Sequence, residues 1–337
     1  MALLDVRNLS IDIETAQGKI RVIDKASLSI VDGSIHGLIG ESGSGKTLIA
    51  KAILGLHASN WTVTADRLFL GQTDLTKLSP RDRRKILGKE ISTIFQEPST
   101  YLDPSQKIRV QIESVLPKKS WKQYCRGLLK KLGYSNVPSS RRLQIKELLH
   151  KVGIQNHVSV LNSYPHQLSE GMCQKVMIAM AIANNPRLII ADEPTTAMEA
   201  VTQSQIFRLL YKLNQLNNTT LLILSNNFAH TSKISDYMTL IYCGQTVESG
   251  SYKHIIEAAM HPYTQAMLKT IMYDGKEHGH KQEIYILPGN IPSSNQLPIG
   301  CRLGPRCPRA QRICVKNPTI TTKKGHSYRC HYPIKLS

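Results

Sequence analysis

The sequence predicts an α/β fold in which a parallel sheet is covered by helices. Ile35–Ile39 reads as a short buried strand, and it leads through a Gly/Ser loop into an apolar helix at Leu48–Leu56. Farther along the chain, an apolar strand at Leu188–Ala191, a helix near Thr202–Leu216 and a strand at Thr220–Leu224 continue the alternation. A strand, a glycine loop and a helix in that order open a nucleotide-binding α/β unit.

Antiparallel strands and a helical region flank this pattern. Residues 1–34 alternate apolar and polar positions, which predicts antiparallel strands. Helical periodicity in Trp121–Leu132 and Leu143–Val152, and a helix start at Ser169, predict a helical subdomain over about 97–185.

The pattern breaks near residue 275, and the remaining sequence is rich in Pro, Cys and Arg. We therefore expect a core domain over 1–274 and a small Cys/Arg-rich C-terminal appendage over 275–337.

The charge balance points to an anionic partner. The chain has 337 residues, and 43 Lys and Arg against 24 Asp and Glu give a net charge of +19. Nucleic acid, an anionic membrane surface and phosphorylated ligands are the partners that such a charge favours. No apolar run approaches the roughly 20 residues of a spanning helix, and Asp5 interrupts any signal peptide. We expect a cytosolic protein.

The Gly/Ser loop fits the phosphate-loop pattern G-x-x-x-x-G-K-[ST]. Its glycines let several backbone N–H groups point at one anion, and the following helix adds its positive N-terminal end. Lys46 is expected to reach the β- and γ-phosphates of a nucleotide, and the Thr47 hydroxyl to ligate Mg²⁺. The loop consists of Gly40, Glu41, Ser42, Gly43, Ser44, Gly45, Lys46 and Thr47.

Two other segments suit the same chemistry. The apolar strand at Leu188–Ala191 ends in Asp192 and Glu193, which suit a Mg²⁺ shell and the activation of water. Ser169 and Gly171 stand at the start of a helix rich in small residues, where they make good phosphate contacts. Taken alone, the acids fit a solvated strand end and Ser169 fits a simple helix cap.

The order of four motifs resembles the ATP-binding cassette (ABC) family: GESGSGKT, then Gln96 within IFQEPSTYLDP, then LSEGMCQ, then LIIADEPTTA. QEP…LDP, the helix VMIAMAIA and the tail CRLGPRCPRAQRIC resemble the ATPases of the oligopeptide/dipeptide transporter group. The resemblance covers almost the whole chain.

The resemblance implies a role for each motif residue. Gly40–Thr47 would bind the triphosphate of ATP, and Gln96 would sense Mg²⁺ and link the catalytic site to the permease. Asp192 would support Mg²⁺, and Glu193 would be the general base. Ser169 and Gly171 would contact the γ-phosphate bound to a partner subunit, so that two ATP molecules lie between two such subunits. The implied partners are a second ATPase, two membrane permease subunits and, at one remove, an extracytoplasmic substrate-binding protein. The implied location is peripheral, at the cytoplasmic face of the inner membrane.

Three departures from the family pattern bear on turnover. Asn226 stands where a histidine usually contacts the γ-phosphate, and an amide cannot carry positive charge. Glu170 replaces a glycine, and a carboxylate repels polyphosphate unless it is turned away. Met198-Glu199 replaces Leu-Asp. We expect slow hydrolysis, and we expect pairing with a different ATPase, because a homodimer would place the Glu170 and Asn226 changes in both sites.

The appendage contains Cys301, Cys307, Cys314 and Cys330 in a basic segment. The spacing is unlike the C-x-x-C of a zinc ribbon, and four thiolates suit a [4Fe–4S] cluster, as the resemblance also implies. Free buried thiols and zinc are the alternatives.

Three functions stay open at this level: a transport ATPase for peptides or small cations such as polyamines, a nucleotide-sensing regulatory subunit with little hydrolysis, and a soluble ABC ATPase acting on nucleic acid. The transporter motifs favour the first, so we expect no nucleic-acid partner.

Overall fold

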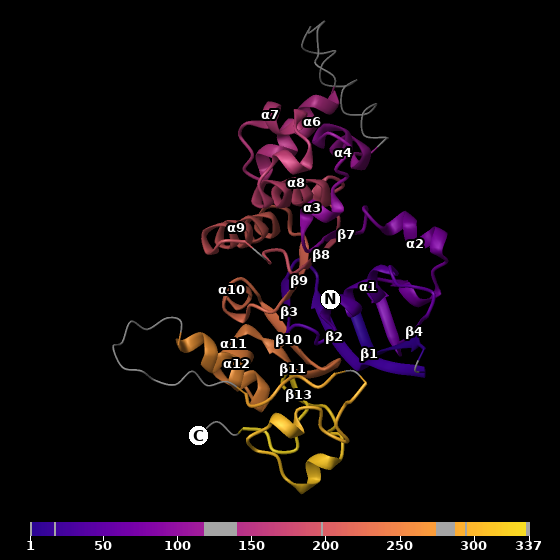
Figure 1. The fold of residues 1–337 in the computed structure, drawn as a ribbon, viewed down its shortest axis with the longest axis vertical. Coiled ribbons are helices and arrows are strands. Elements are labelled where there is room, and N and C mark those ends of the chain that lie inside the picture. The colour runs from indigo at the N-terminus through magenta and orange to yellow at the C-terminus, as the bar shows by residue number, and fades with distance from the viewer. Residues whose placement is uncertain are drawn as a thin grey trace, which may run out of the picture. The chain divides into compact units, whose positions relative to one another are not determined.

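The computed structural model describes residues 2–16, 18–117, 140–196, 198–273, 287–293 and 295–334 (Figure 1). The chain divides into two compact units, one of Met1–Arg84 with Thr220–Ser337 and the other of Lys85–Thr219. The helix predicted at Trp121–Leu132 lies outside the described residues. The boundary predicted near residue 275 stays a prediction.

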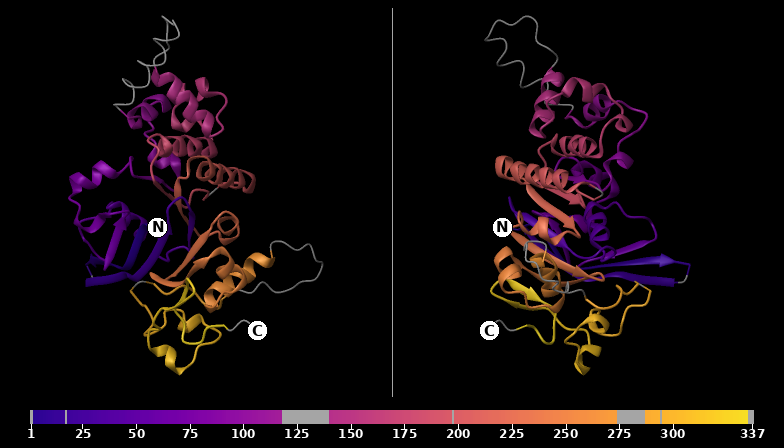
Figure 2. Two further views of the ribbon diagram at one scale, coloured as in Figure 1. Left: turned by 180° about the vertical axis from the view of Figure 1, so that it is seen from behind. Right: turned by 60° about the vertical axis from the view of Figure 1, so that its left-hand side comes forward.

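The first unit opens with the predicted antiparallel strands. Strands β1 (Ala2–Thr15) and β2 (Gly18–Val31) pair antiparallel along most of their length, and Figure 2 shows them as the long indigo ribbon. Along its other edge, β1 pairs antiparallel with β4 (Trp61–Thr64) and β5 (Arg67–Leu70). Strand β6 (Thr73–Asp74) pairs with β5, so the strand order is β2-β1-β5-β6. The prediction for residues 1–34 is confirmed.

A second sheet of this unit carries the glycine loop. Strand β3 (Ile35–Ile39) lies between two parallel neighbours, β9 (Thr220–Ser225) and β10 (Tyr237–Tyr242). All residues of β3 and β9 are buried, which is why both strands read as mainly apolar segments. From β10 the sheet continues antiparallel through three strands: β11 (Gln245–Ser251), β13 (His326–Tyr328) and β12 (Thr321–Lys323).

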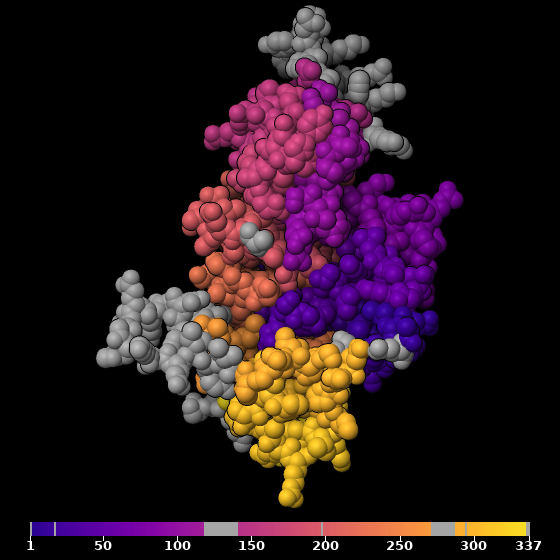
Figure 3. Space-filling view, in the orientation of Figure 1, coloured from indigo at the N-terminus to yellow at the C-terminus, as the bar shows by residue number. Residues whose placement is uncertain are grey.

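The described part of the appendage, residues 287–293 and 295–334, is thereby built into the first unit. Its strand β13 extends the sheet, and Leu303 belongs to the same buried cluster as Leu240, Tyr242 and Tyr263. In Figure 3 it is the yellow surface. The helices of this unit are α1 (Lys46–Leu54), η1 (Leu75–Lys77), α10 (Phe228–Ser232), α11 (Tyr252–Glu257), α12 (Pro262–Tyr273), η3 (Gly304–Arg306) and η4 (Arg312–Val315). Helix α2 (Pro80–Ile86) runs across the end of the first segment.

The second unit is mainly helical. Its strands β7 (Ile91–Ile94) and β8 (Leu188–Asp192) pair in parallel. Its helices are α3 (Pro98–Tyr101), α4 (Ile108–Val115), α6 (Ser140–Lys151), α7 (His157–Asn162), η2 (Pro165–Gln167), α8 (Glu170–Ile182) and α9 (Ala200–Asn217). The helices predicted at Leu143–Val152 and near Thr202–Leu216 are confirmed. No helix in the described ranges is both long and apolar enough to cross a bilayer.

Candidate nucleotide site

The loop Gly40–Thr47 joins β3 to α1 and is held by backbone hydrogen bonds to β9 and within the loop. Gly40 N donates to Ser225 O at the end of β9 (3.3 Å), and Ser44 N donates to Glu41 O (3.1 Å). Lys46 is only 3% exposed, and its Nζ lies 2.8 Å from Gly40 O and 3.1 Å from Glu41 O. A positive charge is therefore held inside the curve of the loop.

Close packing and backbone conformation disfavour a side chain at two of the loop glycines. A Cβ at Gly40 would lie 2.3 Å from Ile241 O, and a Cβ at Gly45 would lie 2.4 Å from Ile23 Cδ1. Gly45 also has a φ of 102°, which other residues rarely adopt. Ser44 is 1% exposed, and its Oγ has no hydrogen-bond partner among the described residues. A cradle of N–H groups with a buried hydroxyl and a buried cation suits a phosphate ligand.

The second unit places Gln96, Asp192 and Glu193 at one edge of its strand pair. Ile94 of β7 pairs with Ala191 of β8, so Gln96 and Asp192 follow at the carboxyl ends of neighbouring parallel strands. Glu193 comes next, with a left-handed φ of 44°, and its Oε2 accepts from Thr196 Oγ1 at 3.1 Å. A strained backbone at a strand end is typical of functional positions.

The residues of the LSEGMCQ motif lie at the start of α8. Ser169 is the N-cap, and its Oγ accepts from Met172 N at 3.3 Å. A Cβ at Gly171 would lie 2.9 Å from Thr202 Cγ2 on α9, which disfavours larger residues. Glu170 Oε1 accepts from Ser99 Oγ at 3.4 Å, so this carboxylate has a partner within the second unit.

One buried residue in this motif has a role that sequence reasoning missed. Gln174 is fully buried, and its Nε2 donates to Pro194 O at 2.9 Å, directly after Glu193. It ties α8 to the turn that carries the predicted base. The available signal was an amide in a helix whose other buried residues are apolar.

Asn226 directly follows β9, whose last residue, Ser225, accepts the bond from Gly40. It is exposed, and it lies one residue from this contact with the loop. The cap of α10 is made by its neighbour instead, because Asn227 Oδ1 accepts from His230 N at 3.1 Å.

The donor types at the predicted Mg²⁺ positions fit the ion. Thr47 offers a hydroxyl, Gln96 an amide oxygen and Asp192 a carboxylate, and Mg²⁺ prefers such hard oxygen ligands. Asp192 is 8% exposed, at the end of a fully buried strand.

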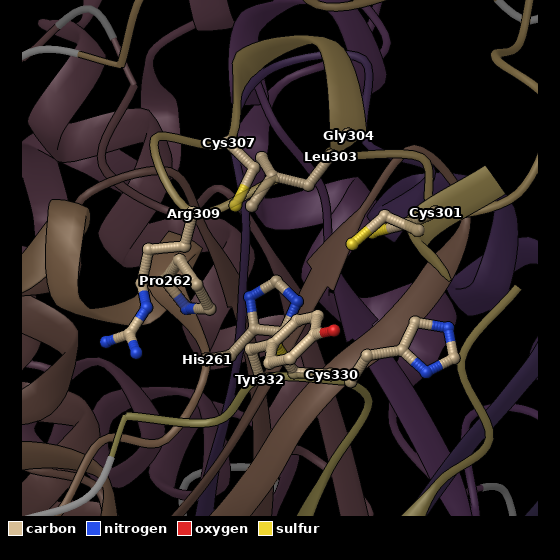
Figure 4. Close-up of a pocket in the computed structure, with 11 residues that line it drawn as sticks. His261, Pro262, Cys301, Leu303, Gly304, Cys307, Arg309, Cys330 and Tyr332 are labelled. Atoms are coloured by element: carbon tan, nitrogen blue, oxygen red, sulfur yellow. The ribbon is translucent and has the colours of Figure 1, made fainter. Parts of the chain in front are cut away.

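The four appendage cysteines line one small cavity together with His261, Arg309 and Tyr332 (Figure 4). Burial raises the pKa of Cys330 to about 11 and also raises the pKa of Cys301 and Cys307, so these groups are neutral thiols near pH 7. The described residues contain no group of three or more His, Cys, Asp or Glu side chains placed to hold a metal ion. The geometry therefore does not support the predicted [4Fe–4S] cluster.

Comparison with known proteins decides the family. The model described as "ABC transporter" matches residues 23–196, which contain the loop, Gln96, the α8 motif and the two acids. The chain belongs to the ABC transporter family. A second model, "Oligopeptide/dipeptide transporter, C-terminal region", matches residues 247–314.

Curated relatives match along the whole length. The chain is 48% identical to the peptide transport system ATP-binding protein SapD of Salmonella typhimurium, covering 100% of this chain and 99% of that protein. It is 47% identical to SapD of Haemophilus influenzae, covering 100% and 94%. It is 38% identical to the dipeptide transport ATP-binding protein DppD of Escherichia coli, covering 99% and 98%.

Solved structures agree in fold. The ABC cassette MJ0796, bound to ADP and Pi, matches with a TM-score of 0.59 and 23% identity, over 74% of this chain and 98% of that chain. CbiO1 from Clostridium perfringens, part of the cbiONQ transporter complex, matches with a TM-score of 0.60 and 19% identity, over 76% and 91%. The predicted family, the ABC-type α/β fold class and the predicted class of activity, an ATP-hydrolysing transport subunit, are confirmed.

Proposed function

We propose that this chain binds and hydrolyses ATP to drive peptides through a separate membrane permease. The observation that carries the proposal is the closed loop around Lys46, in a chain that matches peptide-transport ATPases end to end. Lys46 and the loop amides hold the phosphates of ATP. Thr47, Gln96 and Asp192 are the residues that would hold magnesium, which would supply charge neutralisation when bound. Glu193 accepts the proton of the attacking water.

The cargo class follows from the relatives, whose names specify peptide and dipeptide transport. Small cations such as polyamines are the alternative cargo. The chain binds at the cytoplasmic face of the membrane with two permease subunits, and a substrate-binding protein delivers the cargo on the other side. Its charge of +19 favours an anionic membrane surface over an uncharged one.

The second ATPase of the complex is a different chain. A sandwich dimer assigns Glu170 and Asn226 to opposite nucleotide sites. With a partner that keeps the usual residues, each site contains one altered residue, whereas a homodimer would contain both in both sites. The exposed position of Asn226 beside the loop contact of Ser225 supports a direct effect on the ATP at this chain's own loop.

All four cysteines of the appendage line one cavity, and this is the reason to test the appendage for iron. A [4Fe–4S] cluster there would need the raised thiol pKa values to fall, because thiolates are the ligands. Iron and acid-labile sulfide analysis of anaerobically purified protein tests this, and protein without either contradicts it.

The function is tested by purifying the tagged chain from solubilised membranes. Two permease subunits and one different ATPase should co-purify, and peptide with its binding protein should stimulate ATP turnover in reconstituted vesicles. Recovery in the soluble fraction with nucleic acid would contradict the proposal. A membrane complex that binds ATP but has no stimulated turnover would favour the regulatory alternative.

A further inference from the structure

The second residue of the phosphate loop is held by the C-terminal appendage. Arg306 Nη1 lies 3.2 Å from Glu41 Oε2 and 3.4 Å from Oε1, although 265 positions separate the two residues. The Arg306 side chain is 8% exposed and that of Glu41 is 29% exposed. Such a pair is screened far less by water and salt than a pair on the surface.

Arg306 is itself fixed on several sides. Its Nε donates to Pro288 O at 3.0 Å, and its Nη1 donates to Tyr242 Oη at 3.3 Å. The guanidinium carbon lies 5.8 Å from the centre of the Tyr242 ring. The planar guanidinium therefore presents its charge to Glu41 in one defined position.

The backbone of Glu41 is held from the same side. Its N–H donates to Tyr263 Oη at 3.0 Å, and Tyr263 is fully buried with its ring centre 5.0 Å from that of Tyr242. Glu41 O in turn accepts from Lys46 Nζ. Any movement of Glu41 would therefore move an oxygen that positions the lysine of the loop.

The charge of Glu41 opposes the ligand of the loop. A carboxylate within a loop that receives a polyphosphate repels it, and in a partly buried site such repulsion is several times stronger than in water. Arg306 is the cation that the described contacts place on this carboxylate.

We propose that Arg306 is a positioning residue for nucleotide binding, which neutralises Glu41 and holds it away from the polyphosphate. The appendage thereby completes the phosphate site of this chain. The inference rests on ATP binding at Gly40–Thr47, so wild-type affinity is measured first. Absence of wild-type binding would overturn the proposed function and this inference together, whereas an unaffected Arg306 variant of a binding chain would overturn this inference alone.

The experiment is a double-mutant cycle in which ATP affinity is measured on the full chain. Arg306→Met should weaken ATP binding about tenfold, because it leaves the Glu41 carboxylate uncompensated. Glu41→Gln alone should strengthen binding a few-fold, since Arg306 then adds unopposed positive charge. Glu41→Gln in the Arg306→Met background should restore affinity to within about threefold of wild type, because no repelling carboxylate remains.

Arg302→Met is the matched control. Arg302 is equally buried in the same appendage, and its ion pair at 3.2 Å is with Asp24, which is outside the loop. Glu41→Gln should restore nothing that Arg302→Met loses. In the intact transporter, Arg306→Met should raise the KM for ATP and leave kcat within about twofold, because the contact acts on binding.

Two results would overturn the inference. One is wild-type ATP affinity in a folded Arg306→Met chain. The other is a folded double variant that binds as weakly as Arg306→Met, which would make Arg306 a packing residue only. If Arg306→Met does not fold, Glu41→Gln still decides, because weaker binding in that variant contradicts repulsion by the carboxylate.

Discussion

The phosphate loop and the end of β9 lie next to each other in one unit, yet they differ in how firmly they are built. Three residues of the loop are held by other groups: Gly40 bonds to Ser225, Lys46 to two carbonyls, and Glu41 to Tyr263 and Arg306. Asn226, one residue beyond Ser225, is exposed and replaces the cationic side chain that the family pattern predicts. We therefore propose that ATP binding is preorganised in this chain while a contact specific to hydrolysis is weakened.

Removing the lysine of the loop should have the largest effect on ATP binding. Lys46→Ala should abolish ATP binding or nearly so, because the buried Nζ is the cation held inside the loop. Equilibrium binding of a fluorescent ATP analogue measures the effect, with thermal unfolding as the check on folding. Near-normal affinity would remove the assignment of this loop to phosphate.

Glu193→Gln should abolish most hydrolysis while leaving ATP binding intact. ATP should still bind, and turnover should fall about 10²–10⁴-fold, because the general base is lost while the shape of the side chain is kept. Steady-state phosphate release and ATP affinity are measured on the same preparation. Unchanged turnover would mean that Glu193 is a bystander, and lost binding would mean that its role is structural.

The pH dependence of folding stability tests how firmly β3, the strand that leads into the loop, is buried. Burial lowers the pKa of His36 on β3 to about 4, below its ordinary value of 6.5. The folded state then binds fewer protons than the unfolded chain between these values, so stability is complete above pH 6.5 and falls on the way down to pH 4. The expected slope is about 1.4 kcal/mol for each pH unit.

Urea unfolding at pH 7 and pH 5 measures this loss. In His36→Gln, whose amide can keep the bond to Thr239, the part of the pH dependence due to this group should disappear. An unchanged pH dependence in the variant would show that His36 is not the responsible group.

The loop and the strands beside it were predictable from sequence because their signals are local. Short, mainly apolar segments predicted β3, β8 and β9, and a contiguous eight-residue pattern predicted the loop. The partners of Glu41 could not be found in this way. Tyr263 and Arg306 lie 222 and 265 positions away, and nothing near them marks them as neighbours of a phosphate loop.

At Glu170 and at the four cysteines, too, the sequence shows the residue types but not the contacts that tertiary packing gives them. The replacement of glycine by Glu170 was visible in the sequence, but its bond to Ser99 depends on how α3 packs on α8. The four cysteines line one cavity, but their spacing did not determine whether they are placed to hold a metal.

The most direct test of a well-formed binding loop beside a weakened hydrolysis contact is the Asn226→His variant of the reconstituted complex. A protonated histidine would donate a charge-assisted hydrogen bond as charge develops on the departing γ-phosphate, and such bonds are roughly twice as strong as neutral ones. The account predicts a steady-state ATPase rate several-fold above wild type with ATP affinity nearly unchanged. An unchanged rate in an intact complex would contradict it, and would show that Asn226 does not limit the chemistry.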